Sequence, residues 1–81
     1  MIEPLYDNVV LRFKGLNGQL ALGRVIAVGP GRNFDGTFIK PHIIDGDLVW
    51  YPPDMALRFE KDHYEDYLTI EEQYIIGKGV E

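Results

Sequence analysis

Residues 23–51 read GRVIAVGPGRNFDGTFIKPHIIDGDLVWY, and this stretch decides the fold. Short apolar runs alternate in it with glycine, proline and aspartate, which favour turns. Asp35-Gly36 is a signal for a two-residue hairpin turn. Pro41 ends the strand that returns from this hairpin, because proline has no amide hydrogen to donate to a neighbouring strand. The stretch therefore predicts a strand at 25–28, a hairpin around 35–36, a turn at 45–47 and a buried strand at 48–51.

The segments on either side of this stretch are also short and β-rich. No segment shows a helical period over the roughly 11 residues that would make a helix convincing. Six or more short strands separated by glycine and proline predict an all-β protein, either a small β-barrel or a sandwich. The further strands are expected at 9–11, 55–59 and 67–70, with a rigid break at 52–54, an exposed turn at 60–66, one helical turn at 71–73 and a closing apolar segment at 74–76.

Length and composition limit what the chain can do. Its 81 residues support one domain, residues 1–81, and a domain of this size often needs oligomerisation for stability. The chain has no cysteine, which excludes disulfides and thiolate metal sites. Its net charge of −5, without a basic patch, argues against a nucleic-acid partner, because such binding depends on phosphate neutralisation. We expect a cytoplasmic protein without a membrane partner, since no apolar run reaches about 18 residues and the N-terminus does not have the pattern of a signal peptide.

Residues that could carry out catalysis are few. His42 and His63 stand alone in the sequence, without the spacing of a zinc site. Residues 45–47 begin like a calcium loop but lack the later ligands, and residues 29–32 lack the third glycine of a phosphate-binding loop. The chain has no serine, which together with the absence of cysteine excludes the usual hydrolytic triads. The acidic residues of 60–66 are interpreted as a solvated surface, so we expect no enzyme activity, no metal and no cofactor.

The connection at residues 15–22, GLNGQLAL, combines glycines with leucines. Asn17-Gly18 is a strong hairpin signal. Two interpretations remain open for the leucines that follow it. Either Leu20 and Leu22 begin the next strand and face the core, or they form a short apolar hook for the groove of a partner protein.

Several motifs, taken together, are similar to those of a known family. Residues 4–10 read PLYDNVV and residues 23–32 read GRVIAVGPGR. Lys40-Pro41 and residues 44–49, IDGDLV, follow, and residues 67–76 read YLTIEEQYII. On these motifs the chain resembles the GroES family of co-chaperonins, the small lids of chaperonin rings. The similarity covers nearly the whole chain, and its most specific part is the family's Gly-x-Val-x-Ala-Val-Gly-x-Gly run.

The resemblance implies a small irregular antiparallel β-barrel with a roof hairpin at 29–41, assembled into a homo-heptameric dome. The tip of the roof would be formed by Asn33, Phe34, Asp35 and Gly36. Terminal strands of neighbouring subunits pair in this family, which would place Ile2 and Leu5 of one subunit against Tyr74, Ile75 and Ile76 of the next.

The resemblance also implies a partner and a mechanism. A co-chaperonin caps a chaperonin ring in its nucleotide-bound state, with ATP bound by the partner. In the family a long mobile loop makes this contact, whereas here only residues 15–22 remain. The opening pattern of the family has arginine where this chain has Asn8. The expected chaperonin contacts are Leu16, Leu20, Ala21 and Leu22.

An alternative function keeps the barrel and loses the chaperonin contact. The chain would then be a structural or assembly module, for example of a viral particle, and a virus-encoded protein would act in the host cytoplasm. The state of residues 15–22 distinguishes the two hypotheses. A mobile segment with exposed leucines favours the lid, and a rigid segment with buried leucines favours the module.

Overall fold

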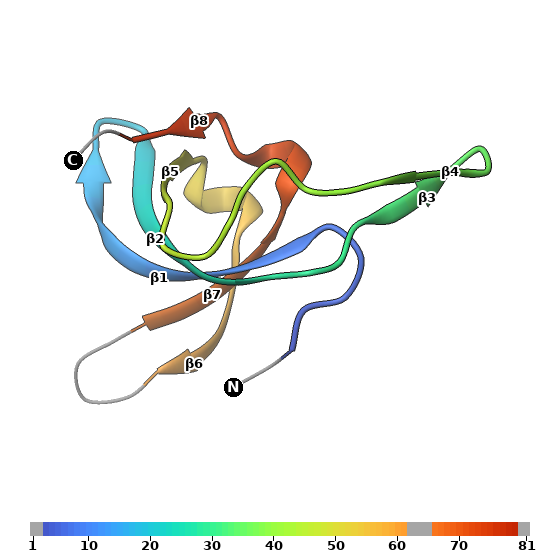
Figure 1. The fold of residues 1–81 in the computed structure, drawn as a ribbon. Helices are drawn as coiled ribbons and strands as arrows, with labels where there is room; N and C mark the ends of the chain where they lie inside the picture. The colour runs from blue at the N-terminus through green and yellow to red at the C-terminus, as the bar shows by residue number, and fades with distance from the viewer. Residues whose placement is uncertain (1–2, 62–65, 80–81) are drawn as a thin grey trace.

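Six strands form one antiparallel sheet that curls into an irregular barrel (Figure 1). The computed structural model describes residues 3–61 and 66–79. The strand order of the sheet is β6–β7–β1–β2–β5–β8, so β6 and β8 are its two edges. This arrangement confirms the predicted all-β fold class. The strands are β1 (Asn8–Asn17), β2 (Leu20–Val28), β5 (Leu48–Tyr51), β6 (Leu57–Lys61), β7 (Asp66–Glu71) and β8 (Gly77–Lys78).

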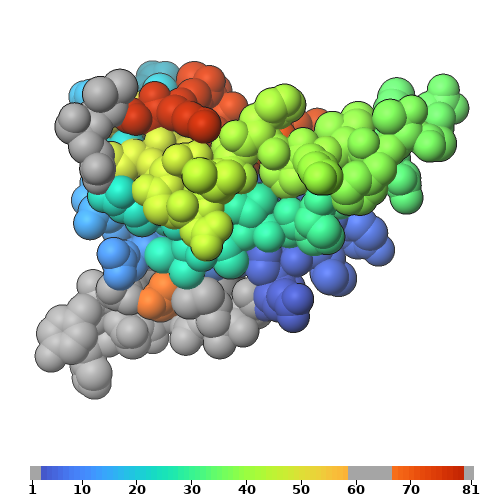
Figure 2. Space-filling view, in the orientation of Figure 1, coloured from blue at the N-terminus to red at the C-terminus, as the bar shows by residue number. Residues whose placement is uncertain are grey.

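A separate two-stranded hairpin, which we call the arm, projects from one end of this barrel (Figures 1 and 2). It consists of β3 (Arg32–Phe34) and β4 (Thr37–Ile39). Asp35 and Gly36 connect the strands with φ angles of 53° and 81°. Positive φ at both central residues is the signature of a type I′ turn, which suits the twist of a hairpin. The hairpin predicted at Asp35-Gly36 is thus confirmed.

The strand boundaries differ from the predictions where proline and glycine obscure the pattern. β1 runs to Asn17 instead of ending near residue 11, and β6 begins at Leu57. Residues Pro53–Met55 form a 3₁₀ turn, in which the Met55 amide donates to the Pro52 carbonyl. A second 3₁₀ turn at Glu72–Tyr74 lies one residue beyond the predicted helical turn. The predicted exposed turn at 60–66 falls mostly on residues 62–65, which include His63. These four residues lie outside the described part of the chain.

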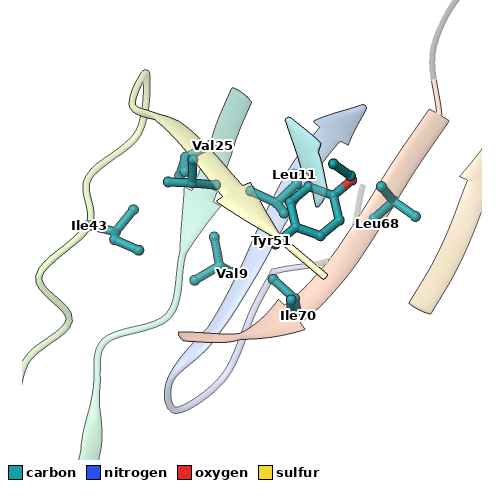
Figure 3. Close-up of a cluster of buried hydrophobic side chains, with 9 residues drawn as sticks. Val9, Leu11, Val25, Ile43, Tyr51, Leu68 and Ile70 are labelled. Atoms are coloured by element: carbon teal, nitrogen blue, oxygen red, sulfur yellow. The ribbon is translucent and has the colours of Figure 1, made fainter. Parts of the chain in front are cut away.

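The core lies inside the curl of the sheet (Figure 3). A shift in the β1–β2 register pairs Val10 with Ala27 and Leu11 with Val25, so that Ile26 is an extra residue on β2. Such a bulge bends and twists the strand, which helps the sheet to close around its own side chains. The buried cluster consists of Val9, Leu11, Ala21, Val25, Ile43, Val49, Tyr51, Leu68 and Ile70.

Residues 29–31 end β2 because the chain passes close to its own N-terminal turn there. The Gly29 amide donates to the Asn8 carbonyl at 2.9 Å, and the Gly31 amide donates to the Tyr6 carbonyl at 2.8 Å. A methyl group at Gly29 would overlap with the carbonyl oxygen of Tyr6, and one at Gly31 would overlap with that of Ile39. These glycines are therefore required by close backbone contact.

Candidate functional site

Residues 15–22 form the end of the β1–β2 hairpin, and the strands stay paired up to the turn. Leu16 pairs with Ala21, and Asn17 pairs with Leu20. Only Gly18 and Gln19 connect the strands, and Gly18 has a φ of +65°. A single positive φ at the first central residue is typical of a type II′ hairpin turn. The Asn17-Gly18 signal therefore marked a real hairpin, whose central residues are Gly18 and Gln19.

One face of this hairpin tip is on the core side of the sheet, where an open hollow leads to the buried side chains. Ala21 is fully buried in the core cluster, whereas Leu16 beside it is 66% exposed. Leu16 and Phe13 border an open hollow of about 340 Å³, and the Tyr51 ring lies at its floor. Because Ala21 has no exposed surface, it cannot contact a partner while the hairpin is folded. Of the predicted chaperonin contacts on this face, Leu16 is the one that a partner can reach.

The other face of the tip carries Leu20 and Leu22, which are both half-buried. Both leucines begin β2, as the first interpretation had it, but they lie on the face away from the core. Leu22 pairs with Trp50 of β5, and its side chain lies close to the backbone of Gly79. Leu20 and Trp50 border a small groove of about 210 Å³, and Ile76 forms part of its rim.

The C-terminal segment is fastened to the same chain. β8 pairs with β5, and the Ile76 amide donates to the Trp50 carbonyl at 2.8 Å. Tyr74 and Ile75 pack against the chain's own core, so they are less available to a neighbour than the sequence suggested. Ile76 and Leu5 are 65% and 60% exposed. Ile2, the fifth residue predicted to lie at a subunit interface, is outside the described residues.

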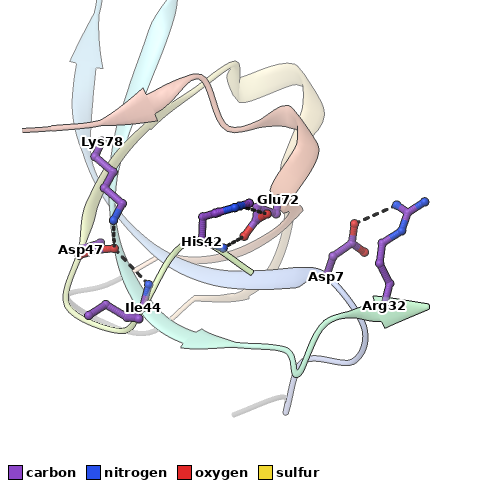
Figure 4. A network of polar contacts seen from close by, with 7 residues as sticks. All are labelled: Asp7, Arg32, His42, Ile44, Asp47, Glu72 and Lys78. Carbon is purple, nitrogen blue, oxygen red and sulfur yellow. Dashed lines mark hydrogen bonds and ion pairs between the residues drawn. The ribbon is translucent and has the colours of Figure 1, made fainter. Parts of the chain in front are cut away.

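A polar contact holds β8 to the turn at 45–47 (Figure 4). The Asp47 carboxylate accepts a hydrogen bond from the Ile44 amide at 3.1 Å and lies 3.3 Å from the Lys78 ammonium. The Ile44 amide is the main cause of the lowered pKa of Asp47, and Lys78 lowers this pKa further. Asp47 therefore acts as a turn residue, as predicted. The described residues hold no group of His, Cys, Asp and Glu that could bind a metal.

Two further polar contacts fix the base of the arm (Figure 4). The Arg32 guanidinium lies 3.1 Å from the Asp7 carboxylate, and the Glu72 carboxylate accepts a hydrogen bond from the His42 amide at 2.7 Å. The Glu72 amide in turn donates to the Asp7 carbonyl. These partners lie 25 or more residues apart in the sequence, so no local signal pointed to them.

Comparisons with known proteins agree with this architecture. The family model described as the chaperonin 10 Kd subunit matches residues 15–79, which is well over half of the chain. The chain belongs to the chaperonin 10 Kd subunit family. It is also 30% identical to the co-chaperonin GroES of Aggregatibacter actinomycetemcomitans over 91 aligned positions, which cover 94% of this chain and 95% of the relative. Because this chain has only 81 residues, at least ten of the 91 positions have no counterpart in it.

Family membership confirms the resemblance found in the motifs. The family is one of co-chaperonins and not of known enzymes, and the function of the chain is that of a co-chaperonin. Neither comparison favours the alternative of a viral assembly module. In the part of the chain that the structure describes, no helix is long and apolar enough to span a membrane.

Proposed function

We propose that the protein assembles into a homo-oligomeric ring, a heptamer as in the family it resembles, which caps a cytoplasmic chaperonin ring in its nucleotide-bound state. ATP would be bound by the chaperonin. Two observations support assembly. The sheet is open at β6 and β8, and open edges favour pairing with another chain. Leu5 and Ile76 are exposed apolar side chains close to the ends of the described chain, where a neighbouring subunit would cover them.

The proposed chaperonin contact is the β1–β2 hairpin tip. The observation that carries this proposal is Leu16, which is 66% exposed next to a two-residue turn. Figure 1 places this turn at the end of the barrel opposite to the arm, so one end of a ring would meet the partner while the other forms the roof. Leu20 and Leu22, half-buried on the other face, complete the contact; Ala21 is excluded by its burial.

A single hairpin offers little apolar area, and the ring compensates for this. Burying one leucine side chain contributes about 1.5–3 kcal/mol, which by itself gives only weak binding. When several identical tips are held in one ring, each contact after the first becomes effectively intramolecular. The affinity of the lid can therefore be high although each subunit binds weakly, provided that the ring and the chaperonin match in symmetry.

Co-sedimentation with a purified chaperonin ring, with and without ATP, tests this proposal. We expect binding that depends on nucleotide. The variant Leu16→Ser should weaken binding at least about tenfold while the ring stays intact, because Leu16 is exposed and contributes little to folding. Ile44→Ser is the matched control, since Ile44 is 66% exposed but lies between β4 and β5, outside the hairpin tip and both edge strands.

Two results would contradict the proposal in different ways. If Leu16→Ser and Ile44→Ser bind equally well, the hairpin tip is not the contact. If the wild-type protein forms a ring that does not bind the chaperonin in either nucleotide state, the barrel serves as an assembly module.

A further inference from the structure

The arm carries an apolar aromatic side chain on each of its two faces. Asn33 pairs with Phe38 and Phe34 pairs with Thr37, so the two phenylalanines lie on opposite faces, because neighbouring positions along a strand alternate. Phe34 is 60% exposed and Phe38 is 51% exposed. Figure 2 shows the arm standing clear of the barrel. Covering these exposed rings would remove apolar surface from water, which favours a contact on each face.

The two faces have complementary shapes. The face of Phe34 is hollowed at the base of the arm by a groove of about 370 Å³, whose apolar lining includes Ile39 and Pro41. The opposite face carries the Phe38 ring, which rests beside the backbone of Gly31 and remains half exposed. One face therefore provides a groove and the other a protruding ring.

We propose that the Phe38 ring of one subunit inserts into the arm groove of the next subunit, and that this contact repeats around the ring. This inference rests on the proposed ring assembly. Because the groove and the ring lie on opposite faces of one arm, a two-fold symmetric dimer would use only one of them. A head-to-tail contact uses both, and repeating it closes a ring when the rotation per subunit allows.

The charges of the groove are compatible with this occupant. Its charged lining consists of Arg32 and Lys40 with Asp7 and Glu72, so the two signs balance and no net charge opposes the entry of an apolar ring. Arg32, whose side chain is 41% exposed, can also lie against the face of the incoming aromatic ring, which is a favourable cation–π contact.

The groove is formed before assembly. Arg32 at the start of β3 is held by Asp7, and His42 after β4 is held by Glu72. Both segments that join the arm to the barrel are therefore fixed. A surface that is already ordered loses less conformational entropy on binding than a flexible one. The rigid arm thus favours association through a small contact.

Cysteine cross-linking tests the contact directly, because the chain has no cysteine of its own. In the double variant Asn33→Cys, Gln73→Cys, one thiol lies beside Phe38 on the protruding face and the other lines the groove, and Phe38 itself is kept. We expect a short bismaleimide to join these subunits into a covalent ladder that ends at the full ring. Each single variant should remain uncross-linked, and co-assembled single variants should give covalent dimers only. Cross-linking of either single variant alone would overturn the head-to-tail arrangement.

The strength of the contact is measured by dilution. Burying a phenyl group changes an association constant by about ten- to a hundredfold. We expect Phe38→Ser to raise the concentration at which the ring dissociates by at least about tenfold, as followed by analytical ultracentrifugation. Ile44→Ser is the control, because Ile44 is 66% exposed but lies outside the arm. Equal dissociation of both variants and the wild type would overturn the proposal.

The outcomes separate this inference from the proposed function. A wild-type ring whose double variant does not cross-link refutes the arm contact and leaves the lid proposal standing. A ring that cross-links as expected but does not bind the chaperonin refutes the lid and supports the arm contact. A protein that stays monomeric at all concentrations refutes both.

Discussion

Replacing Gly29 by alanine tests the close backbone contact between residues 29–31, which follow β2, and the N-terminal turn around Tyr6. A methyl group at this position would overlap with the carbonyl oxygen of Tyr6 and would lie 3.0 Å from the carbonyl carbons of Leu5 and Tyr6. Carbon and oxygen normally stay about 3.3 Å or more apart, so the two backbone segments must separate by about 1 Å. Overlap of this kind costs about 1–3 kcal/mol.

The same displacement weakens two hydrogen bonds of this backbone contact. The amides of Gly29 and Gly31 donate to the carbonyls of Asn8 and Tyr6, and each such bond contributes about 0.5–1.5 kcal/mol. Alanine also restricts the unfolded chain, which stabilises the fold by about 0.4–1 kcal/mol. We therefore expect Gly29→Ala to lower the free energy of unfolding by about 2–3 kcal/mol, a large part of the stability of a small domain.

Urea unfolding at a fixed subunit concentration measures this change, with the fluorescence of Trp50, the only tryptophan, as the signal. Gly15→Ala is the matched control, because a methyl group at Gly15 would meet nothing within 4 Å. The control should be unchanged or more stable by up to about 1 kcal/mol. A Gly29→Ala protein that unfolds at the same urea concentration as the control would refute the close backbone contact.

Two further predictions concern the pH dependence of stability. The Ile44 amide, aided by Lys78, holds the pKa of Asp47 below its ordinary 3.8. Asp47 therefore stabilises the fold above pH 3.8, and this contribution is lost as the pH falls through the lowered pKa. The variant Asp47→Asn should lose this acid dependence. Because the pair with Lys78 is partly exposed, urea unfolding at pH 7 should show a free energy of unfolding lower by less than about 1 kcal/mol. Burial raises the pKa of Tyr51 from 10.0 to about 12, so its neutral form stabilises the fold fully below pH 10 and this contribution is lost as the pH rises through about 12. Tyr51→Phe should show a flatter decline in thermal stability across that alkaline range, and an unchanged decline would contradict the assignment.

The elements with local turn signals could be predicted from the sequence. The hairpin at Asp35-Gly36 and the strand at 48–51 were found with correct positions, because turn chemistry and a short apolar run are encoded within a few neighbouring residues. The length of β1 was missed because Lys14-Gly15 looks like the start of a loop. In the structure the β1–β2 register shifts there, and the strand continues to Asn17.

The candidate site was predicted only in part, because its surroundings depend on contacts between distant segments. The sequence located the hairpin near Asn17-Gly18 but did not show that Ala21 faces the core while Leu16 faces solvent. Likewise, the sequence around an apolar residue such as Ile75 looks the same whether the core of its own subunit or a neighbouring subunit covers the side chain. The contact between Asp47 and Lys78 had no signal at all, since pairing of β8 with β5 brings the two together.

Residues 15–22 match neither case set out from the sequence, because their strands are paired while Leu16 is exposed and Leu20 and Leu22 are half-buried. This paired hairpin tip changes the energetics of the proposed lid. A flexible loop must be ordered when it binds, and ordering each residue costs about 1–2 kcal/mol of backbone entropy. In this chain the strands are paired up to Gly18 and Gln19, so Leu16 is held in place before any partner arrives. A small apolar contact can then suffice, because little of its free energy is offset by ordering. The remaining affinity must come from the number of tips held together, which makes assembly of the ring a condition for chaperonin binding.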